Sequence, residues 1–310
     1  MWRINIMPNY KNTAGHRFAV VIMARNGRDN AFLWCERKST LKHHSRKGRQ
    51  VFMSGNPHNA KNHLALALDN VETADDLAGL VESTKDSVGV FKIGLEQFIR
   101  FGPAILDTVR RPDTRLFLDL KLHDIPNTVA KAVSAASMHG VDLLTVHTTG
   151  GVEMMKAAVA EADAIRERGM KAPKLLGVTL LTSISADCLR EELRVPFAAA
   201  DQVNHLASLA VEAGMDGIVC SAADLQVLRP IIPDRFEVVT PGIRPAGAAV
   251  QDQKRVTTAG DAIAAGATIV VVGRPITLAE SPGEAAREIV GEIVGKMSCL
   301  RRNQKSPLFD

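Results

Sequence analysis

The sequence predicts an α/β protein, a (β/α)8 TIM barrel preceded by a basic N-terminal extension. From His63 onward, short apolar runs alternate with longer amphipathic ones, and eight of the apolar runs have the length of strands. Eight strand–helix units in about 235 residues match the size of such a barrel. The runs are nearly continuous in Val, Leu and Ile, as in strands buried on both faces of a parallel sheet. A doubly wound sheet is the alternative, but no GxGxxG motif follows the first run, which removes the main support for dinucleotide binding.

Each strand and helix has its own local signal. The expected strands cover residues 64–68, 88–93, 116–120, 141–146, 175–181, 217–220, 236–239 and 268–272. Helices fill the intervals: one carries apolar residues at i, i+3, i+4 and i+7 from Val203 to Ala210 and ends at Gly214, and another runs from Val152 to about Gly169. Because active sites of such barrels lie at the carboxyl ends of the strands, polar residues at those ends are the candidates for chemistry.

The first 60 residues differ from the rest in composition. They contain 11 Lys and Arg against Asp29 and Glu36, a net charge of +9, which leaves −5 for the remainder of a chain whose total is +4. We therefore divide the chain into an extension (1–60), a barrel domain (61–298) and a C-terminal tail (299–310). The extension is expected to be disordered, or absent from the native product because Met53 is a possible start. A transit peptide and nonspecific nucleic-acid binding are the alternatives.

The overall composition is that of an ordinary globular protein. Hydrophobic residues make up 46% and charged residues 23%, which excludes wholesale disorder. No stretch approaches the roughly 18 apolar residues that cross a bilayer. The four cysteines are scattered without a CxxC motif, so neither a disulfide framework nor a zinc site is indicated. We expect a soluble protein of the reducing cytoplasm.

Charged residues gather at the ends of the first three expected strands. Asp69 follows the first strand, and Lys92 lies within the second, where an unpaired charge would cost several kcal/mol. Asp119 and Lys121 are two residues apart on the third, so in an extended strand they point to the same side, about 7 Å apart. Asp124 follows in the loop. Alternating carboxylates would keep each lysine protonated, as suits a proton donor, although a structural salt-bridge network is the alternative.

The last two strands are followed by loops suited to phosphate. Each carries a glycine beside or near an arginine, namely Gly242 with Arg244 and Gly273 with Arg274, and Gln253 adds an amide donor. Barrels of this type commonly bind phosphate after strands seven and eight. Backbone N–H groups and two guanidinium groups fit a phosphate monoester.

These motifs resemble the orotidine 5′-phosphate decarboxylase family, from about His63 to about Lys296. The Asp-x-Lys-x-x-Asp signature of that family corresponds to Asp119, Lys121 and Asp124, and is followed by Ile-Pro-Asn-Thr, as in many bacterial members. Three further segments match: Pro-Gly-Ile-Arg at 241–244, Asp-Gln-x-Arg at 252–255 and Val-Gly-Arg-Pro at 272–275. Only the extension lies outside the pattern.

The resemblance implies an activity and a role for each matching residue. The activity is decarboxylation of orotidine 5′-monophosphate to UMP and CO2, the last step of de novo UMP synthesis, with no metal or organic cofactor. Lys121 would protonate C6 of the pyrimidine and would form a catalytic array with Asp119, Asp124 and Lys92. The implied substrate-binding residues are Asp69, Lys92, Ile125, Thr128, Thr182, Arg244, Gln253, Gly273 and Arg274.

The resemblance also implies a homodimer. In the family the second aspartate of the signature reaches the neighbouring subunit's site, so Asp124, Ile125 and Thr128 would act across the interface. The partners would then be substrate, product and a second copy, with no membrane and no nucleic acid. Two rival functions are a Mg²⁺-dependent sugar-phosphate decarboxylase or aldolase with the same signature, and a noncatalytic phosphate-ligand or nucleic-acid binder driven by the extension.

Overall fold

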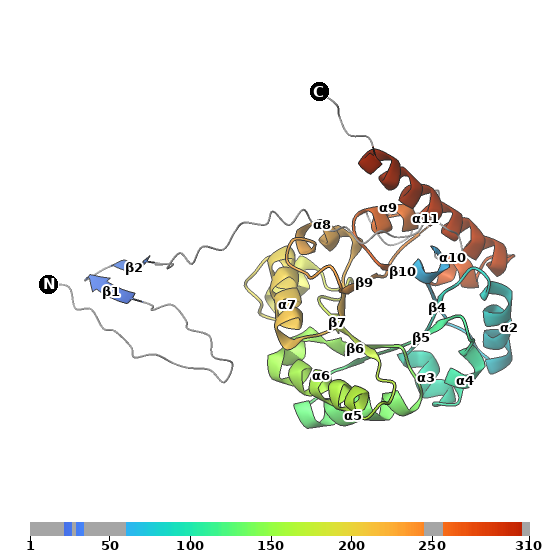
Figure 1. The fold of residues 1–310 in the computed structure, drawn as a ribbon, viewed down its shortest axis with the longest axis horizontal. Helices are drawn as coiled ribbons and strands as arrows, with labels where there is room; N and C mark the ends of the chain where they lie inside the picture. The colour runs from blue at the N-terminus through green and yellow to red at the C-terminus, as the bar shows by residue number, and fades with distance from the viewer. Residues whose placement is uncertain (1–21, 27–28, 34–59, 245–256, 306–310) are drawn as a thin grey trace. The chain divides into compact units, whose positions relative to one another are not determined.

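A computed structural model of the chain describes residues 22–26, 29–33, 60–244 and 257–305. The chain divides into two compact units, Met1–Gln50 and Val51–Asp310. The second unit is a closed barrel of parallel strands surrounded by helices, so the predicted fold is confirmed (Figure 1). The strand order is β10-β3-β4-β5-β6-β7-β8-β9, each strand pairing with its neighbours in sequence and β10 closing on β3.

All eight expected strands are present, with small shifts at their ends. They are β3 (Leu64–Ala67), β4 (Val90–Gly94), β5 (Arg115–Leu122), β6 (Leu143–His147), β7 (Lys174–Val178), β8 (Gly217–Val219), β9 (Glu237–Thr240) and β10 (Ile269–Val272). The largest difference is at β7, which was expected to continue to Leu181 but ends at Val178. The apolar run continues because Leu180 and Leu181 line a cavity instead of pairing in the sheet.

Helices follow the strands around the barrel. They are α2 (Ala74–Thr84), α3 (Leu95–Phe101), α4 (Ile105–Val109), α5 (Pro126–Met138), α6 (Gly151–Glu167), α7 (Ala199–Ala213), α8 (Leu225–Leu228), α9 (Ala259–Ala264), α10 (Arg274–Thr277) and α11 (Pro282–Lys305). Short helical turns lie at Lys61–His63, Thr148–Gly150, Cys188–Glu192 and Ala222–Asp224. Gly214 ends α7 in the left-handed conformation (φ 81°), as the sequence predicts. Helix α11 extends into the segment assigned to the C-terminal tail.

Two apolar clusters form the core of the barrel unit. An outer cluster packs strands against helices, while a smaller inner one fills the barrel with side chains such as Val90, Phe117 and Leu143. Because side chains alternate along a strand, the residues two positions later on the same strands also point inward. These residues are Lys92 and Asp119, and on β6 Thr145. The alternation thus places polar groups above an apolar layer.

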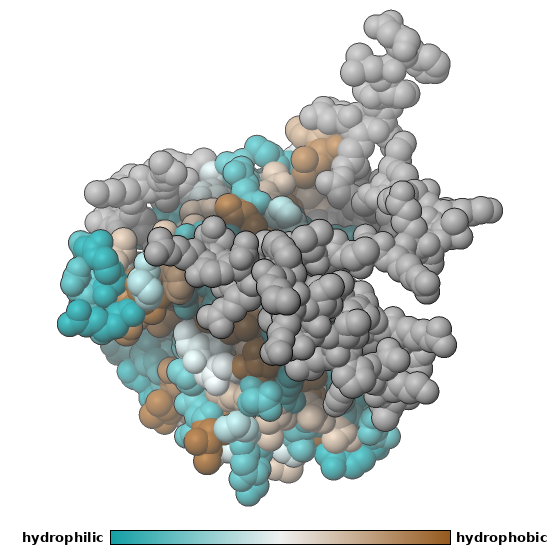
Figure 2. All heavy atoms as spheres, turned by 90° about the vertical axis from the view of Figure 1, so that its left-hand side faces the viewer, coloured by the Kyte–Doolittle hydropathy of each residue, from teal (hydrophilic) through white to brown (hydrophobic). Residues whose placement is uncertain are grey.

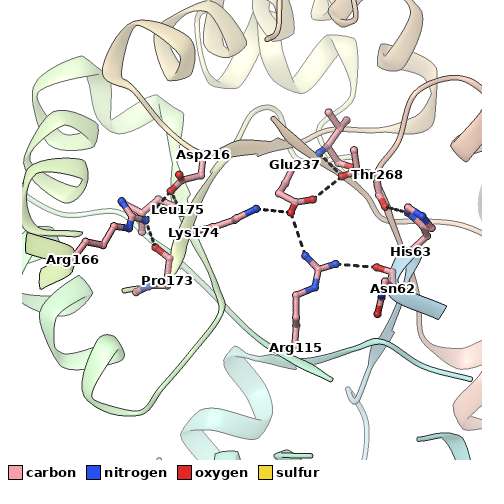
Figure 3. Close-up of polar contacts among 11 residues, drawn as sticks. Asn62, His63, Arg115, Arg166, Pro173, Lys174, Leu175, Asp216, Glu237 and Thr268 are labelled. Carbon is pink, nitrogen blue, oxygen red and sulfur yellow. Dashed lines mark hydrogen bonds and ion pairs between the residues drawn. The ribbon is translucent and has the colours of Figure 1, made fainter. Parts of the chain in front are cut away.

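The amino ends of the strands are tied together by a polar cluster centred on Glu237 (Figure 3). Its Oε1 lies 3.2 Å from Arg115 Nη1 and 2.9 Å from Lys174 Nζ, and its Oε2 accepts a hydrogen bond from Thr268 Oγ1 (3.0 Å). His63 Nδ1 donates to the Thr268 carbonyl (2.6 Å). The cluster joins β5, β7 and β9 to the segments that precede β3 and β10, at the end opposite to the expected site.

Strand β5 departs from the regular geometry that the sequence suggests. Its pairing with β6 shifts register between Leu118 and Leu122, and Lys121 has φ 51°, in the left-handed region. The expected separation of Asp119 and Lys121 assumed an extended strand, and this assumption is wrong at Lys121. Such a conformation is uncommon outside glycine and concentrates at functional sites.

The described part of the first unit is a two-stranded antiparallel sheet of β1 (Ile22–Asn26) and β2 (Asp29–Leu33). Neither strand was predicted, because the expected strands begin at residue 64 and the extension was expected to be disordered or absent. The basic run 37–49 and Met53 lie outside the described residues. Within the described ranges, every helix is too short or too polar to span a bilayer. On the face shown in Figure 2, hydrophobic residues lie among hydrophilic ones.

Candidate active site

Two lysines and two aspartates form a connected charged array at the carboxyl ends of β3, β4 and β5. Lys92 Nζ lies 3.1 Å from Asp69 Oδ2 and 3.5 Å from Asp119 Oδ2. Lys121 Nζ donates to the same Asp119 oxygen at 2.9 Å. The Lys92 side chain is only 8% exposed, and its charge is matched by carboxylates as the sequence analysis expected. The array alternates in sign: Asp69, Lys92, Asp119, Lys121.

Asp119 is held in its ionised form. Burial raises the pKa of this carboxyl, but the ammonium groups of Lys92 and Lys121, with hydrogen bonds from Lys121 and Thr145, outweigh burial and bring the pKa below its ordinary value. A negative charge therefore lies between two cations.

The buried Thr145 side chain on β6 connects Asp119 to the unusual backbone of Lys121. Thr145 Oγ1 donates to Asp119 Oδ1 (2.9 Å) and accepts from the Lys121 backbone N–H (2.8 Å). The register shift in β5 leaves this N–H without a backbone partner in the β5–β6 ladder, and the threonine hydroxyl supplies one. The Thr145 side chain thus contacts both Asp119 and Lys121, the central pair of the array.

Gly94 leaves the space in which Asp69 and Lys92 meet. A Cβ at this position would lie 2.7 Å from Asp69 Oδ1 and 3.2 Å from Lys92 Nζ. The first distance is shorter than a real Cβ contact, so a side chain here would require the Asp69 carboxylate to move.

A cavity of about 220 Å³ adjoins the array. Lys92, Asp119 and Lys121 form its charged side, and Thr182 contributes a polar group. The rest of the wall is mainly apolar and includes Val178, Val219, Val239 and Val271. An apolar wall excludes water and lowers the local dielectric, which strengthens the field of the charges.

Two further side chains, Cys220 in the cavity wall and His147 at the end of β6, are electrically neutral at neutral pH. Burial raises the pKa of the Cys220 thiol to about 12, so Cys220 forms part of the apolar wall, as a small buried hydrophobe. Burial and the neighbouring His123 lower the pKa of His147, whose ring centroid lies 5.4 Å from that of His123. The Nδ1 atom of His147 has no hydrogen-bond partner among the described residues.

Asp124, Ile125 and Thr128 lie apart from the array of their own chain. All three are exposed, with Ile125 66% exposed. The Asp124 carboxylate accepts a hydrogen bond from the backbone N–H of Ile125 (2.6 Å), and within the described part of the chain it forms no ion pair with Lys92 or Lys121. The structure therefore places three of the predicted site residues on the surface, beside the start of α5.

The predicted phosphate-binding residues lie after β9 and β10. Arg244 is partly buried, and its backbone N–H donates to the Thr257 carbonyl (3.3 Å). Gly273 directly follows β10 and precedes α10, and Arg274 is exposed at the first position of that helix. Gln253 lies outside the described residues.

Comparison with known proteins identifies the family. The model of the Orotidine 5'-phosphate decarboxylase / HUMPS family matches residues 62–289. The chain belongs to this family. Relatives named orotidine 5'-phosphate decarboxylase include those of Nostoc sp., 45% identical over 74% of this chain and 96% of the relative, and Pelobacter propionicus, 46% identical over 74% and 93%.

A solved decarboxylase structure supports the same assignment. The crystal structure of orotidine 5'-phosphate decarboxylase from Lactobacillus acidophilus matches with a TM-score of 0.65 and 38% identity, over 74% of this chain and 98% of that one. The matched region is the barrel unit, so the family assignment concerns the barrel and leaves the extension unassigned.

In this member of the decarboxylase family, two residues that shape the array, Thr145 and Gly94, are not among those that the sequence motifs indicate. Thr145 and Gly94 belong to no family motif noted in the sequence. A signal for Thr145 was present, because a polar residue within the buried run Leu-Leu-Thr-Val-His requires an internal partner. Gly94 carries no comparable signal, since a glycine at a strand end is also common in ordinary turns.

Proposed function

We propose that the protein is an enzyme that decarboxylates orotidine 5′-monophosphate to UMP and CO2, the last step of de novo UMP synthesis. Family membership and the names of the relatives support this proposal. The observation that carries it is the ammonium of Lys121, held 2.9 Å from a largely buried carboxylate at the edge of a mainly apolar cavity.

The reaction requires stabilisation of a carbanion. When the bond between C6 and the carboxylate breaks, CO2 leaves and the electron pair stays on C6 in an sp² orbital that no adjacent carbonyl delocalises well. A fixed ammonium next to C6 stabilises this charge electrostatically. Lys121 then transfers a proton to C6 to give UMP, and the neutral amine regains a proton from solvent. The cavity wall keeps bulk water from weakening the interaction.

Asp119 has two roles in this proposal. It pairs with the Lys121 ammonium and holds it in place, and its negative charge repels the carboxylate of the bound substrate. The repulsion disappears once CO2 departs, so the site favours the transition state over the bound substrate. Preorganisation of the charges, rather than ground-state stress, is the main contribution that we propose.

Binding of the remote parts of the substrate positions the base. We assign the ribose hydroxyls to Asp69 and Lys92, and the base to the region of Thr182. The phosphate is assigned to Arg244 and Gln253 after β9 and to Gly273 and Arg274 after β10, where two guanidinium groups and backbone N–H groups converge in the family pattern. Binding energy from the phosphate is then available to orient C6 towards Lys121.

The active form in this proposal is a homodimer with shared sites. Asp124, Ile125 and Thr128 of each subunit would enter the site of the other. Their exposure in the single chain supports this role, because a 66% exposed isoleucine beside an exposed carboxylate gains from being covered. We further propose a cytoplasmic location, which is supported by three free thiols among the described cysteines, Cys188, Cys220 and Cys299.

Ultraviolet absorbance provides the test. Purified protein mixed with orotidine 5′-monophosphate should produce UMP, and excess EDTA should leave the rate unchanged, because the proposed chemistry uses no metal. If the folded dimer does not convert this substrate but acts on sugar phosphates with Mg²⁺, the decarboxylase proposal is wrong and the metal-dependent lyase replaces it.

A further inference from the structure

Thr145 is a buried residue to which the proposed mechanism gives no role. It lies on β6, fully buried, two residues after the inward-facing Leu143. Its hydroxyl acts as both donor and acceptor within the array. It donates a hydrogen bond to Asp119 Oδ1 (2.9 Å) and accepts one from the Lys121 backbone N–H (2.8 Å). The two contacts are 26 and 24 residues away in sequence, so the pairing of β5 with β6 brings them together.

We propose that Thr145 is a positioning residue for the decarboxylation, one that fixes Lys121 and Asp119 relative to each other. The proposal rests on the function proposed above. Thr145 has no contact with the reacting atoms in this assignment. It acts through the backbone of one array member and the carboxylate of the other.

The backbone contact matters because the conformation of Lys121 is unfavourable by itself. A lysine with φ 51° persists only where surrounding interactions hold it. The register shift between Leu118 and Leu122 interrupts the regular β5–β6 hydrogen bonding at this point. The Thr145 hydroxyl accepts the hydrogen bond of the Lys121 N–H instead. Without this acceptor, the segment would gain by relaxing towards an extended conformation, which would redirect the side chain and its ammonium.

The carboxylate contact fixes the other half of the pair. Asp119 Oδ2 faces both lysines, while Oδ1 receives the Thr145 hydroxyl. These three contacts leave the carboxylate little freedom to rotate. The threonine hydrogen bond also favours the ionised form of Asp119, together with the stronger influence of Lys92 and Lys121.

The kinetic test removes the hydroxyl while preserving the shape of the side chain. In Thr145→Val, we expect kcat to fall roughly 10- to 100-fold, because a small displacement of Lys121 affects the chemical step, with KM within about twofold of wild type. The acidic limb of the kcat–pH profile should move to higher pH, because Asp119 loses a hydrogen bond to its ionised form. Thr145→Ser, which keeps the hydroxyl, should restore both kcat and the profile.

Thr84→Val provides the matched control. Thr84 is also a buried threonine whose hydroxyl donates to a carbonyl, that of Leu80 (2.6 Å), but it lies on α2 and contacts no member of the array. Thr84→Val should lose stability without changing the pH profile. If Thr145→Val gives wild-type kcat and profile, or if Thr145→Ser fails to restore them, the positioning role is wrong. Should Thr145→Val not fold, Thr145→Ser against Thr145→Ala makes the same comparison.

Amide hydrogen exchange separates this proposal from the proposed function. The Lys121 amide should exchange at least about tenfold faster in Thr145→Val or Thr145→Ala than in wild type or Thr145→Ser, since its acceptor is gone. Equal rates overturn the positioning role whether or not the protein is a decarboxylase. A wild-type protein that protects this amide through Thr145 but does not convert the substrate contradicts the proposed activity and leaves the positioning of the lysine supported.

Discussion

The ammonium of Lys121 borders the cavity and contacts a carboxylate that stays ionised. Replacing Lys121 by alanine removes both the stabilising charge and the proton donor. We expect Lys121→Ala to lower kcat by about 10²- to 10⁴-fold, the usual contribution of general acid catalysis, or by more because the stabilising charge is lost as well. Circular dichroism and thermal unfolding should show an intact fold. Lys156→Ala, which removes a half-exposed lysine on α6, is the control, and near-normal turnover by Lys121→Ala would contradict the proton-donor assignment.

Arg274 is exposed at the first position of α10, next to Gly273. If it binds the phosphate, Arg274→Ala should raise KM for orotidine 5′-monophosphate by about 10- to 100-fold, because an arginine–phosphate contact is a charge-assisted hydrogen bond. The nucleoside orotidine, which lacks the phosphate, serves as the control substrate. Its kcat/KM should be the same in Arg274→Ala and wild type, and an unchanged KM for the nucleotide would remove Arg274 from the phosphate site.

Gly94 gives a steric prediction. In Gly94→Ala the new Cβ would stand 2.7 Å from Asp69 Oδ1, which forces Asp69 away from Lys92. Because both groups are assigned to the ribose, substrate KM should rise by about tenfold or more. Gly79→Ala is the matched control, since nothing lies within 4 Å of a Cβ there and α2 gains a better helix former. Equal KM values for the two variants would show that the Asp69–Lys92 pair tolerates the displacement.

At the scale of whole elements, strands were easier to predict than their irregularities. Near-continuous apolar runs identified all eight barrel strands, because strands buried on both faces need them. The register shift in β5 was not predictable, since neither the residue type of Lys121 nor its neighbours signals a positive φ. The acidic and basic residues of β5 indicated a site in the sequence. The side chains that hold them in place, Lys92 and Thr145, come from β4 and β6. Sequence patterns report burial and charge better than they report pairing register.

The polar cluster at the amino ends of the strands gives a prediction about stability. Burial raises the pKa of Glu237, but the Lys174 hydrogen bond, the charges of Arg115 and Lys174 and the Thr268 hydrogen bond outweigh it, so the pKa lies below its ordinary value of 4.5. A depressed folded-state pKa means that the ionised group stabilises the fold above the unfolded value, and that this stabilisation is lost as the pH falls through the folded value.

Glu237→Gln should therefore lower the free energy of unfolding by about 1–3 kcal/mol at neutral pH. The difference from wild type should shrink as the pH falls below 4.5. Urea unfolding at several pH values measures it, with Glu153→Gln, at an 85% exposed helix position, as the control. If the difference in the free energy of unfolding stays constant with pH, the charge of Glu237 does not stabilise the fold.

At the scale of the whole molecule, the exposed Asp124 allows a test of shared sites. Lys121→Ala and Asp124→Ala should each be nearly inactive alone. Mixed under conditions that exchange subunits, they should recover about a quarter of wild-type activity, because half of random dimers are hybrids and each hybrid has one intact site out of two. Recovery would place Lys121 and Asp124 of one site on different chains. No recovery, with subunit exchange verified by mass, would place them on the same chain.

The signature Asp-x-Lys-x-x-Asp occupies six consecutive residues, yet the geometry of its central pair is set by Thr145 on the following strand and the space beside it by Gly94 on the preceding one. Copying the six residues onto a strand of an unrelated barrel would transfer the charged groups without the contacts that fix their positions. The smallest unit that could be transplanted is the three-strand segment from β4 to β6, with its register shift and with Thr145 and Gly94. Enzyme design with this chemistry should therefore transplant a patch of sheet and not a motif.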